Sequence, residues 1–420
     1  METTILLAIA VLGGFYMAWN IGANDVANAF GTSVGSGALT LRHAILCAAI
    51  FEFCGAFLVG EPVARTISGG IVKAQYFAGA PDLIRLLGVG MLASLIASAI
   101  WMHIASFLGQ PVSTTHAIVG AVIGFALACG GPAYVRWGKI GAIACSWVVS
   151  PVVGGVLAYT VYRWGIQQLI LRSRHPVFMA IATVPVAMGS LVAIVAMSIV
   201  YKGLPRLHLN LPLGRAIALS ALAGAAVFVA TRLGLRRRMR RHGVPRARRY
   251  QVVERWFGRM QIATACYMSF AHGANDVANA IGPLASSMEI LRSGKIPGAV
   301  TVPPWLLAFG GAGIVAGLAM YGYKVIDAVG KKITEITPTR GFAATFGTAT
   351  SVLVFSKLGM PISTTFVIVG AVMGVGFARG FGAIDMKVIR KIFASWLVTI
   401  PICAALSAAV LWVFRAALGL

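Results

Sequence analysis

Acidic residues are scarce in this 420-residue chain. It has 11 aspartates and glutamates against 35 lysines and arginines, and charged residues make up 11% of the sequence. A soluble domain carries roughly a quarter charged residues, so this composition excludes an ordinary soluble protein. Hydrophobic residues make up 59% of the chain, and the mean hydropathy is +0.86. The sequence therefore predicts an integral membrane protein.

The alternation of a membrane β-barrel is also missing. Barrel strands would alternate apolar and polar residues over about ten positions, whereas the apolar runs here are continuous and near the roughly 20 residues of a spanning helix. Lipid-exposed backbone must satisfy its own hydrogen bonds, which leaves helices as the spanning elements. We predict an all-α membrane protein with about twelve segments, near 4–40, 43–60, 83–108, 112–130, 138–163, 177–201, 212–231, 261–285, 301–321, 341–357, 361–378 and 392–414.

The cysteines and the N-terminus show no sign of extracellular processing. The six cysteines form no C-x-x-C pair, and all fall in or beside apolar runs. This favours small buried hydrophobes over disulfides or metal ligands, and we expect no bound cofactor. Glu2 precedes the first apolar stretch and no basic region does, so we expect a membrane segment there and not a cleaved signal peptide.

Residues 232–259 interrupt the apolar pattern with eleven arginines and a single acid, Glu254. RNA binding is a remote alternative, because basic loops beside membrane helices normally lie on the cytoplasmic side. We therefore predict a solvated cytoplasmic loop. We expect the protein to have the lipid bilayer as its partner, and no nucleic acid. Counting segments from this loop places both termini outside, in a plasma or inner membrane.

Three strings occur twice, close to 250 residues apart, which indicates an internal duplication. "GANDVANAFG" (22–31) recurs as "GANDVANAIG" (273–282). "QPVSTTHAIVGAVIGF" (110–125) recurs as "MPISTTFVIVGAVMGV" (360–375), and "SWVVSP" (146–151) recurs as "SWLVTIP" (395–401).

The number of segments between the two copies predicts their orientation. Seven predicted segments separate equivalent positions, and because seven is odd, the copies should be inverted relative to each other. Inverted repeats with broken or re-entrant helices are typical of secondary transporters, whose substrate lies near the midplane. The proline before each S-T-T triplet leaves open whether its flanking arms are two spans or one re-entrant hairpin. We divide the chain into a first inverted repeat (1–165), two connecting membrane helices (166–231), the basic cytoplasmic loop (232–259) and a second inverted repeat (260–420).

Three acidic residues lie well inside apolar segments: Asp25, Glu52 and Asp276. An ionised side chain there costs roughly 3 kcal/mol, and such residues mark ion or substrate pathways. A structural salt bridge is the alternative, but no lysine or arginine lies in the adjoining apolar stretches. We predict that the three carboxylates bind or couple a cation.

Asparagines accompany the two repeated aspartates. In each copy two asparagines stand four positions apart, so they share a helix face beside the aspartate. Carboxylate and amide oxygens suit a hard cation such as sodium, with proton coupling as the alternative. Glycines bracket each cluster, and we expect the helix to break there and expose carbonyl oxygens. The cation-binding candidates are Asn24, Asp25, Asn275, Asp276 and Glu52, with Asp25 and Asp276 as direct sodium ligands.

The repeated P-[VI]-S-T-T string supplies the complementary chemistry. Proline suits the first helical position and serine or threonine the N-cap, and a helix start binds anions through its free N–H groups. We predict a tetrahedral oxyanion beside the cation, with ordinary N-capping as the alternative. The role of His116 stays open, because Phe366 stands at its equivalent position. The anion-binding candidates are Ser113, Thr114, Thr115, Ser363, Thr364, Thr365, Asn28 and Asn279.

On both repeated strings, the sequence resembles the inorganic phosphate transporter (PiT) family over essentially the whole chain. "GANDVANAFGTSVGSGALTL" and the "FEFCG" stretch around Glu52 are similar to the sodium-coupled branch. The resemblance implies phosphate import by sodium symport, a homodimer, and binding of phosphate and cation by the motif residues given above. Some relatives are proton-driven or carry sulfate. The alternatives are therefore a proton-coupled phosphate or metal-phosphate symporter, or a sulfate permease of the same fold.

Two other classes of protein are also compatible with an anion site in a membrane. An anion channel would need no cation site, so the repeated aspartates count against it. An enzyme acting on a phosphorylated lipid would need a nucleophile–base pair or metal-ligand spacing, which the sequence does not show. We therefore expect a transporter and not an enzyme.

Overall fold

The computed structural model describes residues 2–108, 112–200, 211–241, 245, 248–298, 300–329, 337–380 and 386–419. Throughout these residues the regular structure is helical, apart from one isolated β-bridge between Val72 and Val135. The all-α prediction is therefore confirmed for the described part of the chain. The elements are α1 (Glu2–Gly35), α2 (Leu41–Val59), α3 (Glu61–Gly69), η1 (Ala74–Phe77), α4 (Pro81–Phe107), α5 (Thr114–Gly130), η2 (Gly131–Tyr134), α6 (Trp137–Thr160), the π-helix η3 (Val161–Leu171), α7 (Pro176–Ser198), α8 (Leu213–Arg241), α9 (Arg249–Ser293), α10 (Pro304–Val329), α11 (Pro338–Lys357), α12 (Thr364–Arg379) and α13 (Met386–Leu418).

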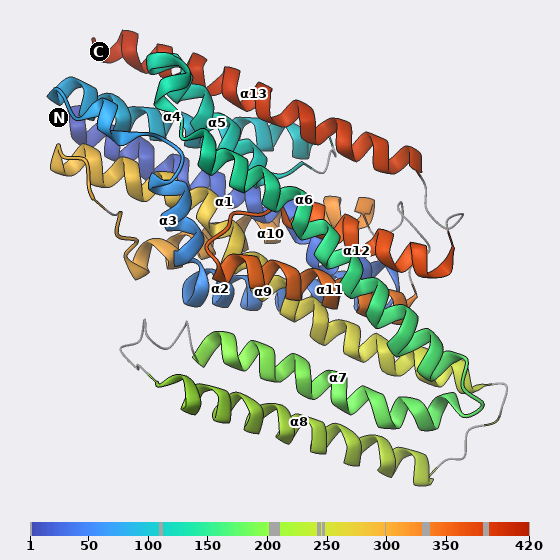
Figure 1. Cartoon of the computed structure of the whole chain (residues 1–420). Coiled ribbons are helices and arrows are strands. Elements are labelled where there is room, and N and C mark those ends of the chain that lie inside the picture. The colour runs from blue at the N-terminus through green and yellow to red at the C-terminus, as the bar shows by residue number, and fades with distance from the viewer. Residues whose placement is uncertain are drawn as a thin grey trace.

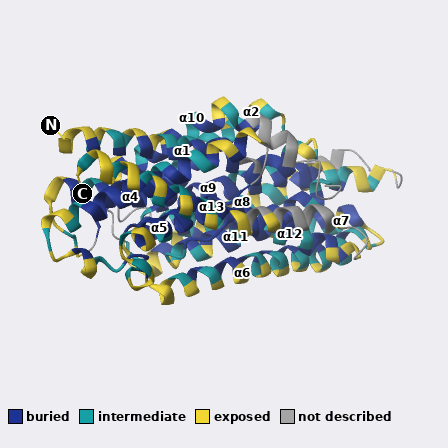
Figure 2. Cartoon of the chain, turned by 90° about the horizontal axis from the view of Figure 1, so that it is seen from above, coloured by how far each residue is buried: buried dark blue, intermediate teal, exposed yellow. Residues whose placement is uncertain are grey.

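Nine helices in the described residues are long and apolar enough to cross a membrane. The predicted segments at 261–285, 341–357 and 361–378 are not among them, and they lie in α9, α11 and α12. Figure 2 shows α9 inside the bundle, and most of its side chains from Trp256 to Leu291 are buried. Because protein surrounds this helix, its polar side chains avoid the penalty that lipid contact would impose.

The long helices form one bundle, and α7 and α8 pack against each other along its side (Figure 1). Residues 24–28 and 275–279 form the two N-D-x-x-N clusters. The helices that carry them, α1 and α9, lie in the bundle, where α1 packs on α10 and α2 packs on α9. Both termini lie at the same end of the molecule, and the arginine-rich end of α8 lies at the opposite end (Figure 1).

The helices run through the repeated clusters without a break, so the predicted helix break was wrong. Both α1 and α9 are continuous α-helices across these residues. The glycines serve close helix packing instead. A Cβ atom on Gly22 would lie 1.8 Å from the carbonyl oxygen of Ile314, and one on Gly273 would lie 2.2 Å from that of Glu52. Small residues that let two backbones approach are a common feature of membrane helix pairs.

Interruptions occur instead before the two S-T-T triplets. Helix α4 ends at Phe107 and α5 begins at Thr114, whereas α11 ends at Lys357 and α12 begins at Thr364. In each case the two arms pack against each other, so α4–α5 and α11–α12 are helical hairpins.

The two hairpins open toward opposite ends of α9. At the start of α11, the backbone N–H of Thr339 donates to Glu254, near the start of α9, at 3.0 Å. The open end of the α4–α5 hairpin is held near Val72 by the bridge to Val135. Val72 lines a cavity with Ile290, near the other end of α9. Hairpins that enter from opposite ends bring their S-T-T triplets into the middle of the bundle.

Candidate functional site

The predicted site residues gather in the interior, where α1 and α9 meet the starts of α5 and α12. Each of these side chains is at most 4% exposed. The structure therefore brings together residues that are up to 341 positions apart in the sequence. They are Asn24, Asp25, Asn28, Glu52, Ser113, Thr114, Thr115, Asn275, Asp276, Asn279, Ser363, Thr364 and Thr365.

The serines of the two triplets cap helices. Ser113 and Ser363 have extended backbones, and their hydroxyls accept the backbone N–H of His116 and Phe366 at 3.2 and 3.3 Å. The N-capping alternative thus describes the serines, because a cap of this kind satisfies a free N–H at the helix start. The threonines that follow each serine contact the N-D-x-x-N clusters instead.

Within each copy, the first threonine of the triplet donates to the aspartate. The hydroxyl of Thr114 donates to Asp25 Oδ2 at 2.9 Å, and that of Thr364 donates to Asp276 Oδ2 at 3.0 Å. The two contacts are equivalent under the sequence repeat. Each aspartate is therefore tied to the start of a helix that belongs to its own copy.

Between the copies, the asparagines reach the opposite triplet. Asn28 donates to Thr365 Oγ1 at 2.9 Å, and Asn279 donates to the hydroxyl oxygens of Thr114 and Thr115 at 3.2 and 3.3 Å. These bonds cross from one copy to the other in both directions. The two copies therefore build a single buried site.

Two further serines join the site and were missed in the sequence. Asn24 donates to Ser106 Oγ at 2.9 Å, and Ser356 donates to Asn275 Oδ1 at 3.2 Å. The sequence does contain the signal, because each serine stands seven positions before the serine of a triplet, in S-F-L-G-Q-P and S-K-L-G-M-P. The repeated string therefore begins earlier than the proline.

His272 pairs with two of the buried acids, which sequence reasoning also missed. Its Nδ1 lies 2.7 Å from Glu52 Oε2, and its Nε2 lies 2.7 Å from Asp276 Oδ2. All three side chains are fully buried. His272 stands one helical turn before Asp276 and therefore lies on the same helix face, where a histidine can pair with the aspartate as a lysine or arginine would. Glu52 and Asp276 thus have a partner within the protein.

The first copy carries no histidine at the equivalent position. Its equivalent of His272 is Ile21. Ile314 stands where the second copy has Glu52, because Gly22 packs on the backbone of Ile314 in the same way as Gly273 packs on the backbone of Glu52. Asp25 Oδ1 is buried and has no hydrogen-bond partner among the described residues, and the same holds for Asn279 Oδ1. Asp276 Oδ1, in contrast, accepts from Asn275 at 2.6 Å and from Asn279 at 3.4 Å.

These unpaired oxygens are suited to a cation. Asp25, His272 and Asp276 offer atoms that lie within 4.8 Å of one another. A buried acceptor without a donor costs about 1–3 kcal/mol, and more when it is charged. A hard cation such as sodium prefers carboxylate and amide oxygens, so the donor set around Asp25 fits such an ion.

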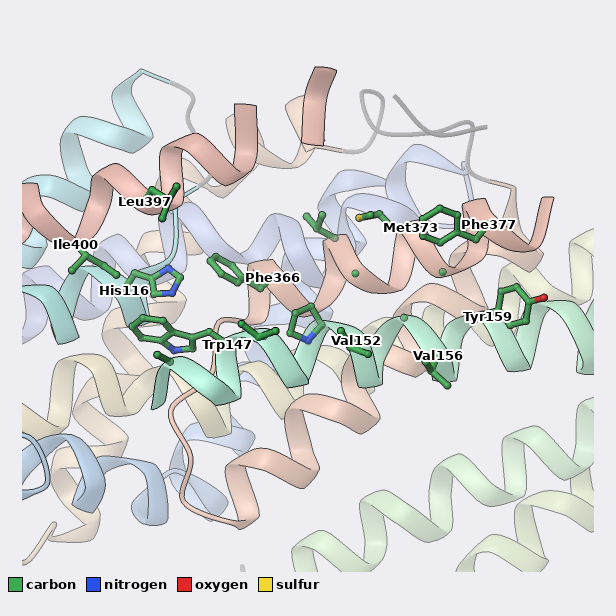
Figure 3. Close-up of a pocket in the computed structure, with 17 residues that line it drawn as sticks. His116, Trp147, Val152, Val156, Tyr159, Phe366, Met373, Phe377, Leu397 and Ile400 are labelled. Carbon is green, nitrogen blue, oxygen red and sulfur yellow. The ribbon is translucent and has the colours of Figure 1, made fainter. Parts of the chain in front are cut away.

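His116 faces away from these contacts. Figure 3 shows its ring against Trp147 and Phe366, with ring centroids 3.8 and 4.4 Å apart. All three residues line an apolar groove of about 800 Å³ between α6, α12 and α13. Nδ1 of His116 has no hydrogen-bond partner. The geometry therefore gives His116 a packing contact behind the triplet and no bond to the N-D-x-x-N clusters.

Comparison with known proteins decides the family. Residues 21–407 match the phosphate transporter family. This chain belongs to that family. It is 47% identical to the chloroplastic inorganic phosphate transporter 2-1 of Arabidopsis thaliana, over 99% of this chain and 73% of that protein. A solved structure, of a protein named the sodium-dependent phosphate transporter, is 40% identical, with a TM-score of 0.89 over 98% of this chain and 99% of that one. The resemblance inferred from the repeated strings is confirmed, and the fold is that of a multi-pass membrane transporter.

Proposed function

We propose that this protein imports inorganic phosphate by symport with sodium. The observation that carries the proposal is the single buried site built from both sequence copies, with anion donors and cation acceptors side by side. Membership of the phosphate transporter family supports phosphate as the substrate. The likeness to a sodium-dependent phosphate transporter supports sodium as the coupling ion.

Phosphate would bind at the starts of α5 and α12. A helix start offers backbone N–H groups and the positive end of the helix dipole. The hydroxyls of Thr114, Thr115, Thr364 and Thr365 lie at these two starts, with Asn28 and Asn279 reaching across. Hydroxyl and amide groups can turn toward an oxyanion, which accepts several hydrogen bonds at once. The threonine–aspartate bonds would open as the anion arrives.

Sodium would bind at Asp25 first. Two carboxylates within 4.8 Å of each other and next to an anion site repel both each other and the substrate. A cation bound by Asp25 Oδ1 and Asn279 Oδ1 would remove that repulsion, because both oxygens lack a donor. Asp276 remains a candidate ligand, although His272 and two asparagines already approach its oxygens. Coupling follows if phosphate binds well only once the cation is in place.

The architecture fits alternating access. We propose that residues 1–165 and 260–420 are inverted repeats joined by two connecting membrane helices and by the basic loop predicted at 232–259, of which α8 contains the residues up to Arg241 and α9 those from Arg249. The opposed α4–α5 and α11–α12 hairpins support this arrangement. With the basic loop in the cytoplasm, both termini would lie outside a plasma or inner membrane. The protein would work as a homodimer in the bilayer, without an enzymatic step or a bound cofactor.

Labelled phosphate uptake into proteoliposomes tests the proposal. An inward sodium gradient should drive uptake, and Asp25→Asn should abolish it. Uptake that does not depend on sodium but is abolished by a protonophore would instead support proton-coupled transport. Sulfate uptake without phosphate uptake would support a sulfate permease. Flux that survives Asp25→Asn without any coupling would support an anion channel.

A further inference from the structure

A cavity of about 400 Å³ lies at the end of the molecule away from the arginine-rich segment. We call it the outer cavity. Its walls come from α3, the turn after α3, the first half of α4, the start of α6, and the last turns of α9 with the loop that follows. Apolar side chains such as Leu87 and Met91 form part of the wall, and polar side chains form the rest.

The charge of the outer cavity has one sign. Arg65, Arg136 and Lys139 line it, and no acidic side chain does among the described residues. Arg65 is paired with Glu61 on its own helix, whereas Arg136 and Lys139 make no ion pair with any described side chain. Both stand at the start of α6 and are exposed. The cavity therefore presents two uncompensated positive charges to solvent.

The floor of the outer cavity lies close to the buried site. Ser286 lines it with a side chain that is 2% exposed. Ser286 follows Asn279 by two helical turns on α9, which is about 10 Å at 1.5 Å per residue. On the part of the wall that α3 forms, the hydroxyl of Thr66 donates to the carbonyl of Gly359 at 2.6 Å. Gly359 lies four residues before Ser363, so α3 covers the approach to the second triplet.

We propose that the outer cavity is a capture site for the free oxyanion substrate, in which Arg136 and Lys139 hold phosphate before it enters the buried site. The inference rests on the proposed function, because it names the entrance to that site. A concave, positively charged mouth raises the local concentration of an anion and speeds its association. The hydroxyl of Ser286 offers a further hydrogen bond where the cavity meets the interior. Thr66 holds the wall in place, since its hydroxyl is already bonded.

Uptake kinetics test the capture site. The variant Arg136→Gln/Lys139→Gln removes both unpaired charges, and the matched control Arg292→Gln/Lys295→Gln removes two charges at the same end of α9 without touching the cavity wall. At low ionic strength, the first variant should raise KM for phosphate at least about threefold, with the maximal rate unchanged. The increase should shrink at high salt, because salt screens exposed charges. An equal increase in the control, or none in either variant, would overturn the proposal.

Chemical protection tests the site without transport. In detergent-purified protein, an amine-reactive reagent should label Lys139 more slowly when inorganic phosphate is added, with gluconate as the anion control and Lys295 as the residue control. Protection of Lys139 together with absent uptake would contradict the proposed function and keep the capture site. Slower labelling only with anionic lipid vesicles would show a lipid headgroup site and overturn the proposal. Equal labelling with phosphate and gluconate would overturn it as well.

Discussion

The two N-D-x-x-N clusters have the same sequence and different surroundings. In the second copy, Asp276 is approached by Thr364, Asn275, Asn279 and His272. In the first copy, the described residues give Asp25 a single hydrogen bond, from Thr114, and leave one of its oxygens without any. The protein itself supplies the partners of one aspartate. It supplies fewer to the other, whose Oδ1 stays without a hydrogen bond among the described residues.

This difference shows how a duplicated site can become asymmetric while its architecture is kept. The helix crossings at Gly22 and Gly273 are alike, and so are the threonine–aspartate bonds. The asymmetry comes from the pair Glu52 and His272, which replaces two isoleucines of the first copy. The two positions that differ between the copies therefore give the two aspartates different surroundings.

The largest effect is expected where the copies are alike. Gly22→Ala and Gly273→Ala each place a methyl group within about 2 Å of a backbone oxygen. Helix backbones cannot yield as side chains do, so the cost should exceed the roughly 1–3 kcal/mol of ordinary overpacking. Both variants should fail to give folded protein in size-exclusion chromatography. Gly138→Ala, with no heavy atom within 4 Å of its added methyl, should behave like wild type. A folded and active Gly22→Ala protein would contradict the proposed role of the crossing.

The next effect is confined to the second copy. His272→Gln leaves two buried carboxylates without their partner, and loss of one partner of a buried ion pair costs about 3–5 kcal/mol. Thermal unfolding in detergent should show a marked fall in midpoint. Ile21→Val, at the equivalent position of the first copy, should cost only about 1 kcal/mol. Adding Glu52→Gln to His272→Gln should recover part of the loss. Equal midpoints for His272→Gln and wild type would show that the contacts of His272 with the two carboxylates do not stabilise the fold.

The corresponding effect in the first copy is on transport. Asp25→Asn removes a charge that accepts one hydrogen bond among the described residues, from Thr114, and an asparagine oxygen can still accept that bond, so stability should change little. Loss of a charged contact worth about 3 kcal/mol corresponds to a roughly hundredfold decrease in transport rate. Sodium-driven phosphate uptake in proteoliposomes should fall by at least that factor while the unfolding midpoint stays within a few degrees. A large fall in midpoint would mean that Asp25 serves the fold and not the cation.

The smallest effect is expected at the bonds that cross between copies. Asn28→Ala and Asn279→Ala should each lower kcat/KM for phosphate about tenfold, from a hydrogen bond of roughly 1–1.5 kcal/mol. Asn20→Ala is the control, because the Asn20 amide donates to Tyr16 within its own helix. It should change uptake less than either. An effect at only one of the two crossing asparagines would argue against a site shared by both copies.

Much of this site could be predicted because the duplication itself is a signal. The repeated strings identified the aspartates, the asparagines and both triplets, and the structure buries them together, with hydrogen bonds both within and between the copies. Single-copy features were harder to find. His272 has no counterpart in the first copy, and its partner Glu52 lies 220 positions away on α2. Only the crossing of α2 over α9 brings these two residues together.

Helix continuity could not be read from composition. Glycine serves both a broken helix and a close crossing, and the choice between them depends on which backbone lies opposite. At Gly22 and Gly273 a neighbouring helix lies there, so the predicted break was wrong. The apolar pattern predicted only residues 261–285 of α9, whereas the helix runs from Arg249 to Ser293 and is largely surrounded by protein.

Binding of labelled sodium to purified protein tests the difference between the two aspartates most directly. The measurement compares wild type, Asp25→Asn and Asp276→Asn in detergent, each normalised to folded protein. If His272 and the asparagines supply the partners of Asp276, Asp25→Asn should weaken sodium binding at least about tenfold more than Asp276→Asn does. Equal losses in the two variants would contradict the account and show that the duplicated aspartates share the cation equally.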